Sequence, residues 1–337
     1  MKQITIKDVA NQAGVSTTTV SHVINKTRFV SEETRKAVEQ AMENLGYHPN
    51  TLARSLRSGE TKTIGLILPD GANPFFADMA RRIENLGFKN GYSVILCNSD
   101  NNLDKQREYI NILIAKQVDG LIFISAGESK EDLIKLITSG TPFVVVDRDI
   151  PLGLADLILL DNEKAGFEAT QHLIELGHKR IACITGPTDI GPSHLRKKGF
   201  QRALKQAGIP INQDYFFPGD FSLAGGVKAM EQLMTIQPQP TSIFALNDLM
   251  AIGAISAAIR KGYKIPENYS VVGFDDIELS SSLSPHLTTM AQPVNLMVET
   301  AIQRLLMKIS VDPDKWKNEE IVLEAELIVR ESTKPIQ

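Results

Sequence analysis

Polar and aromatic side chains follow the predicted strands of this 337-residue chain from residue 63 onward. Carboxylate, amide and guanidinium groups can each bond two neighbouring hydroxyl groups, and aromatic rings can cover the apolar faces of a sugar. Ligands of open α/β sheets bind beyond the carboxyl ends of the strands, so seven such strand ends predict a pocket for a small polyhydroxylated molecule. The residues predicted to line it are Asn73, Phe75, Phe76, Asp147, Arg148, Arg196, Phe221, Asn247, Asp275 and Gln292.

Strands and helices alternate from Thr63 onward, and this alternation must position the predicted pocket residues. Apolar runs such as TIGLILP, GLIFIS and FVVVD are continuous, as in parallel sheets covered on both faces. Two consecutive series of such units predict an α/β core of two doubly wound lobes with a cleft between them. A last helix at 295–309 and one strand at 321–330 are expected to cross back between the lobes. The predicted boundaries are 63–337 for the core, about 63–161 and 293–320 for the N-lobe, and about 162–292 and 321–337 for the C-lobe.

Motifs that would indicate an enzyme are missing from the sequence. It contains no GxSxG, no P-loop and no GxGxxG motif, and its six histidines and two cysteines are scattered, so we predict neither a metal site nor a cofactor. Two carboxylates on different strand ends could form a glycosidase pair, but nothing supplies a general acid in an apolar pocket. A strand-end aspartate is often only the N-cap of the next helix, which is the interpretation we favour for Asp276.

The first sixty residues predict an all-α unit of three short helices. Thr5, Ser16 and Ser31 stand at N-cap positions, and apolar residues recur behind them at helical spacing. Gly14 ends the first helix and leaves a turn of only two or three residues before the second. This arrangement is typical of a helix-turn-helix, which we expect at residues 1–49.

The second predicted helix, in the stretch VSTTTVSHVIN, carries short polar groups on its exposed face. At 100° per residue, Thr18, His22 and Asn25 lie roughly opposite the buried Val20. Short hydroxyl groups let a helix lie deep in a DNA major groove, where they contact phosphates and base edges. A generic three-helix bundle with a polar surface is the alternative, but turn, caps and exposed face agree on DNA binding. The predicted DNA-contacting residues here are Thr17, Thr18, Ser21, His22, Asn25 and Arg28.

A linker with a short helix is predicted at 50–62. Leu52 and Leu56 are spaced i, i+4 on a segment of about two turns, which is too short to be stable alone in water. The two leucines therefore need a partner. Either paired helices from two subunits press them into a minor-groove step, or the helix packs on its own domain.

The segment TIKDVANQAGVSTTTVSHVINKTRFVSEETR, together with NTLARSLRS, resembles the DNA-binding headpiece of the lactose/galactose repressor family. The likeness covers residues 4–58, and the TTTVSH core is most similar to the purine and ribose repressors. The resemblance implies that Thr17, Thr18 and His22 read the major groove with help from Arg28. It also implies that Leu56 is the minor-groove wedge, that Arg57 flanks it, and that the hinge helix folds only on operator DNA.

Residues 62–330 resemble periplasmic sugar-binding proteins and the effector domains of the same repressor family. The predicted pocket residues are similar to those of the ribose-binding protein, through NPFF, DR, an Arg before GF, ND, FD and a late Gln. The sequence departs from that pattern at Ser125, a further predicted ligand contact, where the transport protein has asparagine. This departure favours a pentose in general over ribose in particular.

We therefore expect a transcriptional repressor whose dimer binds a palindromic operator and is released when ribose or a similar sugar closes the cleft. The first alternative is a repressor of the same family that uses a purine or another sugar as effector or corepressor. The second is a sugar-binding transport component, which the helix-turn-helix and the lack of a signal peptide oppose.

Charge and composition agree with this hypothesis. Residues 1–60 carry eight Lys and Arg against six Asp and Glu, whereas the whole chain has a net charge of −4. Cys97 and Cys183 lie in apolar runs and are expected to be buried thiols of a reducing compartment. No stretch is long and apolar enough to span a membrane, so a cytoplasmic protein without membrane contact is expected. The sequence has no leucine heptad tail, which favours a homodimer over a tetramer.

Overall fold

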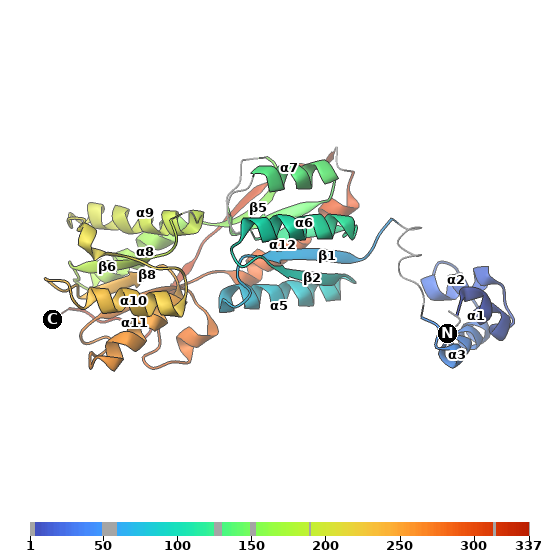
Figure 1. The fold of residues 1–337 in the computed structure, drawn as a ribbon, viewed down its shortest axis with the longest axis horizontal. Coiled ribbons are helices and arrows are strands. Elements are labelled where there is room, and N and C mark those ends of the chain that lie inside the picture. The colour runs from blue at the N-terminus through green and yellow to red at the C-terminus, as the bar shows by residue number, and fades with distance from the viewer. Residues whose placement is uncertain are drawn as a thin grey trace. The chain divides into compact units, whose positions relative to one another are not determined.

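A computed structural model describes residues 4–48, 59–124, 130–148, 153–188, 190–312 and 315–336. The chain divides into two compact units, Met1–Thr61 and Lys62–Gln337, which are described separately. Ser125, Leu56 and Arg57 lie outside the described residues, as does most of the predicted hinge helix. The first unit is all-α and the second is α/β, as the sequence predicts (Figure 1).

The first unit holds the three predicted helices: α1 (Ile6–Ala13), α2 (Thr17–Asn25) and α3 (Glu32–Leu45). Thr5 and Asp8 form a capping box at α1, and Gly14 ends that helix in the left-handed region at φ 67°. The helices pack on Val9, Ala10, Val20, Val38 and Ala41, with the other predicted apolar positions partly buried around them. The prediction of three short helices in this unit is confirmed.

The first lobe of the second unit, the N-lobe, is built on a six-stranded sheet in the order β11-β5-β4-β3-β1-β2. Every strand pair in it is parallel. Helices α5 and α12 cover one face and α6 and α7 the other (Figure 1). The central strands β1, β3, β4 and β5 are therefore buried on both sides and need not alternate in hydrophobicity, whereas the edge strands β2 and β11 are partly exposed. The elements are β1 (Thr63–Leu68), α5 (Pro74–Lys89), β2 (Ser93–Asn98), α6 (Leu103–Ala115), β3 (Gly120–Phe123), α7 (Lys130–Ser139), β4 (Phe143–Val146), β5 (Asp156–Leu160), α12 (Val294–Ser310) and β11 (Glu320–Leu323).

The second lobe, the C-lobe, has a second six-stranded sheet in the order β12-β10-β9-β8-β6-β7. Only β12 runs antiparallel, paired to β10. The elements are α8 (Asn162–Glu175), β6 (Ile181–Thr185), α9 (Gly191–Gln206), η1 (Gln213–Tyr215), β7 (Phe216–Pro218), α10 (Leu223–Leu233), β8 (Ser242–Ala245), α11 (Asp248–Arg260), β9 (Ser270–Asp275), η2 (Glu278–Ser281), β10 (Thr288–Ala291) and β12 (Glu326–Ile328).

The chain passes between the lobes three times, and the last passage corrects a prediction. Residues 321–330 form two strands rather than one, because β11 pairs with β5 of the N-lobe and β12 pairs with β10 of the C-lobe. The predicted lobe boundary after residue 320 is therefore wrong for residues 321–323. An unbroken apolar pattern shows that a segment is extended, but not that it changes sheets halfway.

The sequence predicts neither a membrane-spanning helix nor a metal site. No described helix is long and apolar enough to cross a membrane. Nor do the described histidines, cysteines, aspartates and glutamates form a group that could hold a metal ion. Both cysteines are buried.

Candidate ligand pocket and DNA-contacting helix

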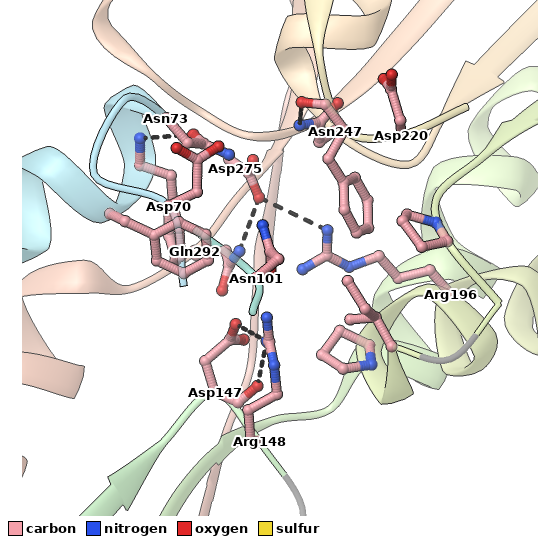
Figure 2. A pocket seen from close by; sticks show the side chains of 16 residues that line it. Asp70, Asn73, Asn101, Asp147, Arg148, Arg196, Asp220, Asn247, Asp275 and Gln292 are labelled. Carbon is pink, nitrogen blue, oxygen red and sulfur yellow. Dashed lines mark hydrogen bonds and ion pairs between the residues drawn. The ribbon is translucent and has the colours of Figure 1, made fainter. Parts of the chain in front are cut away.

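A cavity of about 290 Å³ lies between the two lobes at the carboxyl ends of their strands. Ten of its sixteen lining residues were predicted from the sequence, and they come from both lobes (Figure 2). The structure thus brings together side chains spread from Asn73 to Gln292. The ten are Asn73, Phe75, Phe76, Asp147, Arg148, Arg196, Phe221, Asn247, Asp275 and Gln292.

The N-lobe contributes an aromatic wall and a buried charge pair. Asn73 caps α5 by accepting a hydrogen bond from the Phe75 backbone N–H (3.0 Å). Phe75 and Phe76 meet edge to face, with ring centroids 5.1 Å apart. After β4, Arg148 Nη1 donates to the Asp147 carbonyl (2.7 Å) and to Asp147 Oδ2 (2.5 Å). The backbone of Asp147 is left-handed (φ 59°), which is uncommon for a residue other than glycine and is typical of functional sites.

Arg196 reaches the cavity from α9 in the C-lobe, and it is held on several sides (Figure 2). Its Nε donates to Asn162 Oδ1 and its Nη1 to the Leu246 carbonyl, both at 2.7 Å. Nη1 also lies 3.6 Å from Asp275 Oδ1, and the guanidinium carbon is 3.6 Å from the centroid of the Phe274 ring. Burial lowers the pKa of this guanidinium, and nearby Asp275 and Asp147 raise it. The side chain is therefore fixed as a donor facing the cavity.

Asn247 has a role that the sequence did not reveal. Its Oδ1 caps α11 by accepting from the Met250 N–H (3.0 Å), while its Nδ2 donates to the Phe221 carbonyl (2.9 Å). Phe221 is held in a left-handed conformation at φ 64°. Its ring fills the space beside Gly186, where an added Cβ would lie 2.3 Å from the ring. Asn247 therefore positions an aromatic ring over the cavity as well as lining it.

Asp275 and Gln292 line the cavity and are hydrogen-bonded to each other. Gln292 follows β10 in the crossover to α12, and its Nε2 donates to Asp275 Oδ1 (2.8 Å). The nearby Asp248 is buried and accepts hydrogen bonds from Thr289 Oγ1 (2.6 Å), Ser280 Oγ (2.6 Å) and the Ile277 N–H (2.9 Å). Asp248 thereby ties together α11, β10 and the loop after β9, on which the position of Asp275 depends.

Burial raises the pKa of Asp275, and the Arg196 guanidinium opposes part of that rise. In the unfolded chain an aspartate titrates at about pH 4. Because the folded pKa is the higher one, the contribution of Asp275 to stability is fully present below about pH 4 and is lost as the pH rises through its folded value. We expect an Asp275→Asn variant to lose less stability than the parent between pH 4 and neutrality, as measured by urea unfolding. Equal pH slopes in parent and variant would contradict this assignment.

Six cavity-lining residues were missed by the sequence analysis. Asp70 and Asn101 belong to strand-end loops, and Asp220 stands directly before Phe221, so the strand-end rule could have included them. The other three are apolar and carry no hydrogen-bonding signal: Pro187 follows β6, and Ile190 and Pro192 lie at the start of α9. The six are Asp70, Asn101, Pro187, Ile190, Pro192 and Asp220.

The interpretation of Asp276 as a helix N-cap is wrong. The short helix η2 begins at Glu278, and its N-cap is Ile277, without a side-chain cap. Asp276 instead forms an ion pair with Arg330 (2.7 Å) beyond β12. Its left-handed backbone (φ 58°), next to Asp275 at φ 113°, turns the chain before a helix could start.

In the first unit, α2 presents its predicted face. Thr17 and Thr18 are exposed, whereas Thr19 is half-buried and its N–H donates to the capping Ser16 Oγ (3.0 Å). His22 is half-buried, and its Nδ1 forms a hydrogen bond with Thr27 Oγ1 (2.8 Å), so Nε2 is the ring nitrogen left for an external partner.

Two of the predicted DNA-contacting side chains, Ser21 and Asn25, form hydrogen bonds with each other's residue instead of pointing free into solvent. The Asn25 Nδ2 donates to the Ser21 carbonyl (2.9 Å) and to its Oγ (3.2 Å), so both side chains are engaged within α2. Arg28 is exposed just past the helix. Thr17, Thr18, His22 and Arg28 therefore remain the side chains best placed to contact an external partner.

Comparisons with known proteins agree with this division into units. Residues 61–325 match the family model described as periplasmic binding proteins and sugar binding domain of LacI family. Residues 5–50 match the model of bacterial regulatory proteins, lacI family. A curated relative from Aliivibrio salmonicida, named HTH-type transcriptional repressor PurR, is 42% identical over 97% of this chain and 98% of its own length.

Solved structures show the same likeness. The lac repressor dimer bound to operator and the anti-inducer ONPF is 30% identical, covers 99% of this chain and 100% of that one, and superposes with a TM-score of 0.88. A LacI family transcriptional regulator from Enterococcus faecium with bound ribose is 35% identical over 82% of this chain and 100% of its own, with a TM-score of 0.76.

Proposed function

This chain belongs to the LacI family of bacterial regulatory proteins, and we propose that it is a transcriptional repressor whose hold on operator DNA is controlled by a small molecule bound between the lobes of its core. The observation that carries the proposal is one chain with two sites of different chemistry. One is an exposed helix face with short hydroxyl groups. The other is a cavity lined by buried charged and aromatic side chains.

The DNA-binding part of the proposal rests on α2. Thr17 and Thr18 are short enough to let the helix enter a major groove, and His22 can donate to a base edge or a phosphate. The lac repressor, which shares the fold over nearly the whole chain, is bound to operator as a dimer. We propose the same assembly here, a homodimer on a palindromic operator, since two-fold symmetric proteins read two-fold symmetric sites.

A Thr18→Ala/His22→Ala double variant is expected to weaken operator binding by about 1–3 kcal/mol for each side chain that no longer reaches a base edge. The measurement is fluorescence anisotropy with an operator selected from a randomised palindromic library at fixed salt. Gln40→Ala, an exposed change on α3, is the control and should leave the affinity unchanged. Unchanged operator affinity in the double variant would show that these two side chains do not read the operator, whereas failure of the parent chain to select any operator would favour a sugar-binding protein without DNA function.

Two classes of effector are candidates, a pentose such as ribose and a purine. The relatives that match over nearly the whole chain favour the purine, which the sequence alone made the alternative. A repressor named PurR at 42% identity supports a purine, and Phe75, Phe76 and Phe221 offer rings against which a flat base can pack. The prediction of ribose is not confirmed.

A pentose stays a candidate because of the buried charges. Asp147, Arg148 and Arg196 are groups that bond neighbouring hydroxyls, and the relative from Enterococcus faecium is a regulator with bound ribose. A purine base offers few hydroxyl-like groups to so many charged partners.

Titration with ribose and hypoxanthine separates the two effectors. Each compound is added to the protein alone, in calorimetry, and to the protein–operator complex, in anisotropy. If ribose is the effector, it binds and weakens operator affinity by roughly 5–150-fold, the usual range of allosteric coupling. If hypoxanthine is a corepressor, it binds and strengthens operator affinity instead. Binding of either compound without any change in operator affinity would refute control by that compound.

A further inference from the structure

One buried carboxylate lies close to the cavity without lining it. Asp248, the first residue of α11, is fully buried and accepts three hydrogen bonds. The donors are the Ile277 N–H (2.9 Å) and the hydroxyl groups of Ser280 and Thr289 (both 2.6 Å). All three donors are neutral, so they stabilise the ionised carboxylate but leave its negative charge in place.

The strand register places this carboxylate beside Asp275. A Cβ added at Gly273 of β9 would lie 2.2 Å from Asp248 Oδ1, so the carboxylate lies directly against that part of the strand. Asp275 follows two residues further along β9, and residues i and i+2 of a strand point to the same face, roughly 7 Å apart. On β10, the neighbours of Gly273 and Asp275 are Thr289 and Ala291. The two carboxylates are therefore adjacent on one face of the sheet.

The two carboxylates share one nearby cation. Arg196 of α9 has its Nη1 3.6 Å from Asp275 Oδ1. The other charged groups that face the pair already have partners: Asp147 is paired with Arg148, and Asp276 with Arg330. Burial raises the pKa of both carboxyl groups. At Asp275 the Arg196 guanidinium opposes this rise, and the charge of Asp248 adds to it.

We propose that Asp248 and Asp275 titrate as one coupled pair, so that a residue outside the cavity makes the affinity of the effector site depend on pH. The inference rests on the proposed function of this site. A hydroxyl or N–H group of a ligand forms a stronger hydrogen bond with an ionised carboxylate than with a carboxylic acid. Ligand binding therefore favours the ionised form of Asp275, whereas the adjacent charge of Asp248 favours its protonated form. Affinity thus rises as the pH rises through the titration of the pair.

The first test needs no ligand, so it decides the coupling even if the proposed function fails. Urea unfolding is measured from pH 4 to 8 for the parent, Asp248→Asn, Asp275→Asn and the double variant. Both folded pKa values lie above the unfolded value of about 4, so each contribution to stability is present below that pH and is lost as the pH rises. Each single variant also removes the repulsion on the other carboxylate. The reductions in pH dependence in the two single variants should therefore add up to more than the reduction in the double variant. Strict additivity would overturn the proposal.

The second test measures the affinity of the full-length chain for ribose and for hypoxanthine by calorimetry between pH 5 and 8. For the compound that binds, we expect the affinity of the parent to rise at least about tenfold over this range. In Asp248→Asn the rise should occur at least about one pH unit lower. A purely structural role of Asp248 would lower the affinity equally at every pH, and that result would contradict the proposal. Asp214→Asn, an exposed change in the same lobe, is the control and should leave the profile unchanged.

Ser280→Ala keeps the proposal testable if Asp248→Asn folds poorly. It removes one donor to Asp248 (2.6 Å) but leaves both carboxylates in place. Asp248 then takes up a proton more readily, which reduces the repulsion at Asp275. The rise in affinity should move to lower pH, as in Asp248→Asn but by a smaller amount, and a move to higher pH would count against the coupling. A compound that binds with this pH profile without altering operator affinity refutes the proposed function and leaves the coupled pair standing.

Discussion

Replacing Arg196 with methionine is expected to abolish effector binding and to lower the free energy of unfolding by about 3–5 kcal/mol, the usual cost of removing one partner of a buried ion pair. Methionine has a similar length but no donors. The change would leave Asn162 Oδ1 and the Leu246 carbonyl without their 2.7 Å partner, and Asp275 without its nearest cation. Because the guanidinium also faces the cavity, affinity for the effector should fall by at least about 100-fold.

The matched control for this prediction is Arg202→Met on the same helix. Arg202 forms a surface ion pair with Glu163 (2.8 Å), and its side chain is 47% exposed. Exposed pairs contribute at most about 1 kcal/mol, so this variant should bind the effector normally and unfold at nearly the parental urea concentration. Retention of effector affinity within about threefold in Arg196→Met would show that Arg196 is a core residue and not part of the binding site.

The position of the pocket could be predicted because it follows from a rule about sheets. Parallel strands point their carboxyl ends to the same edge, so residues as distant as Asn73 and Asp275 had to converge wherever the two sheets face each other. The three headpiece helices were equally readable, since caps, spacing and the glycine turn all act locally. In both cases each residue is placed by a signal in its own neighbourhood, either a strand end or a helix cap.

What could not be predicted depends on contacts between distant elements. Asn247 was placed in the pocket, but its hold on Phe221 depends on how α11 lies beside the loop after β7. The apolar residues Ile190 and Pro192 line the cavity only because α9 starts there. Likewise, Asp276 pairs with Arg330, which is far away in the sequence, and no local capping pattern can indicate that pairing.

The approach of α9 to α8 is itself set by two glycines, which leads to the second large effect. A Cβ added at Gly199 of α9 would lie 2.1 Å from the Glu163 carbonyl oxygen, and one at Gly166 of α8 would lie 2.3 Å from the Arg196 carbonyl oxygen. The two helices thus touch backbone to backbone. Because both oxygen atoms belong to helix backbone and not to flexible side chains, the helices themselves would have to separate if a methyl group were added.

Gly199→Ala is therefore expected to lower the free energy of unfolding by about 3 kcal/mol, the upper end of the usual cost of overpacking, although alanine is the better helix former. Asn162 and Arg196, whose 2.7 Å bond joins the same two helices, would move apart, so effector affinity should fall at least about tenfold. Urea unfolding and calorimetry measure the two effects. Gly191→Ala makes the same substitution in α9 where a Cβ meets no atom within 4 Å, so its stability should stay within about 1 kcal/mol of the parent. If Gly199→Ala were as stable as Gly191→Ala, the close packing of α8 on α9 could not be what holds Arg196 in the pocket.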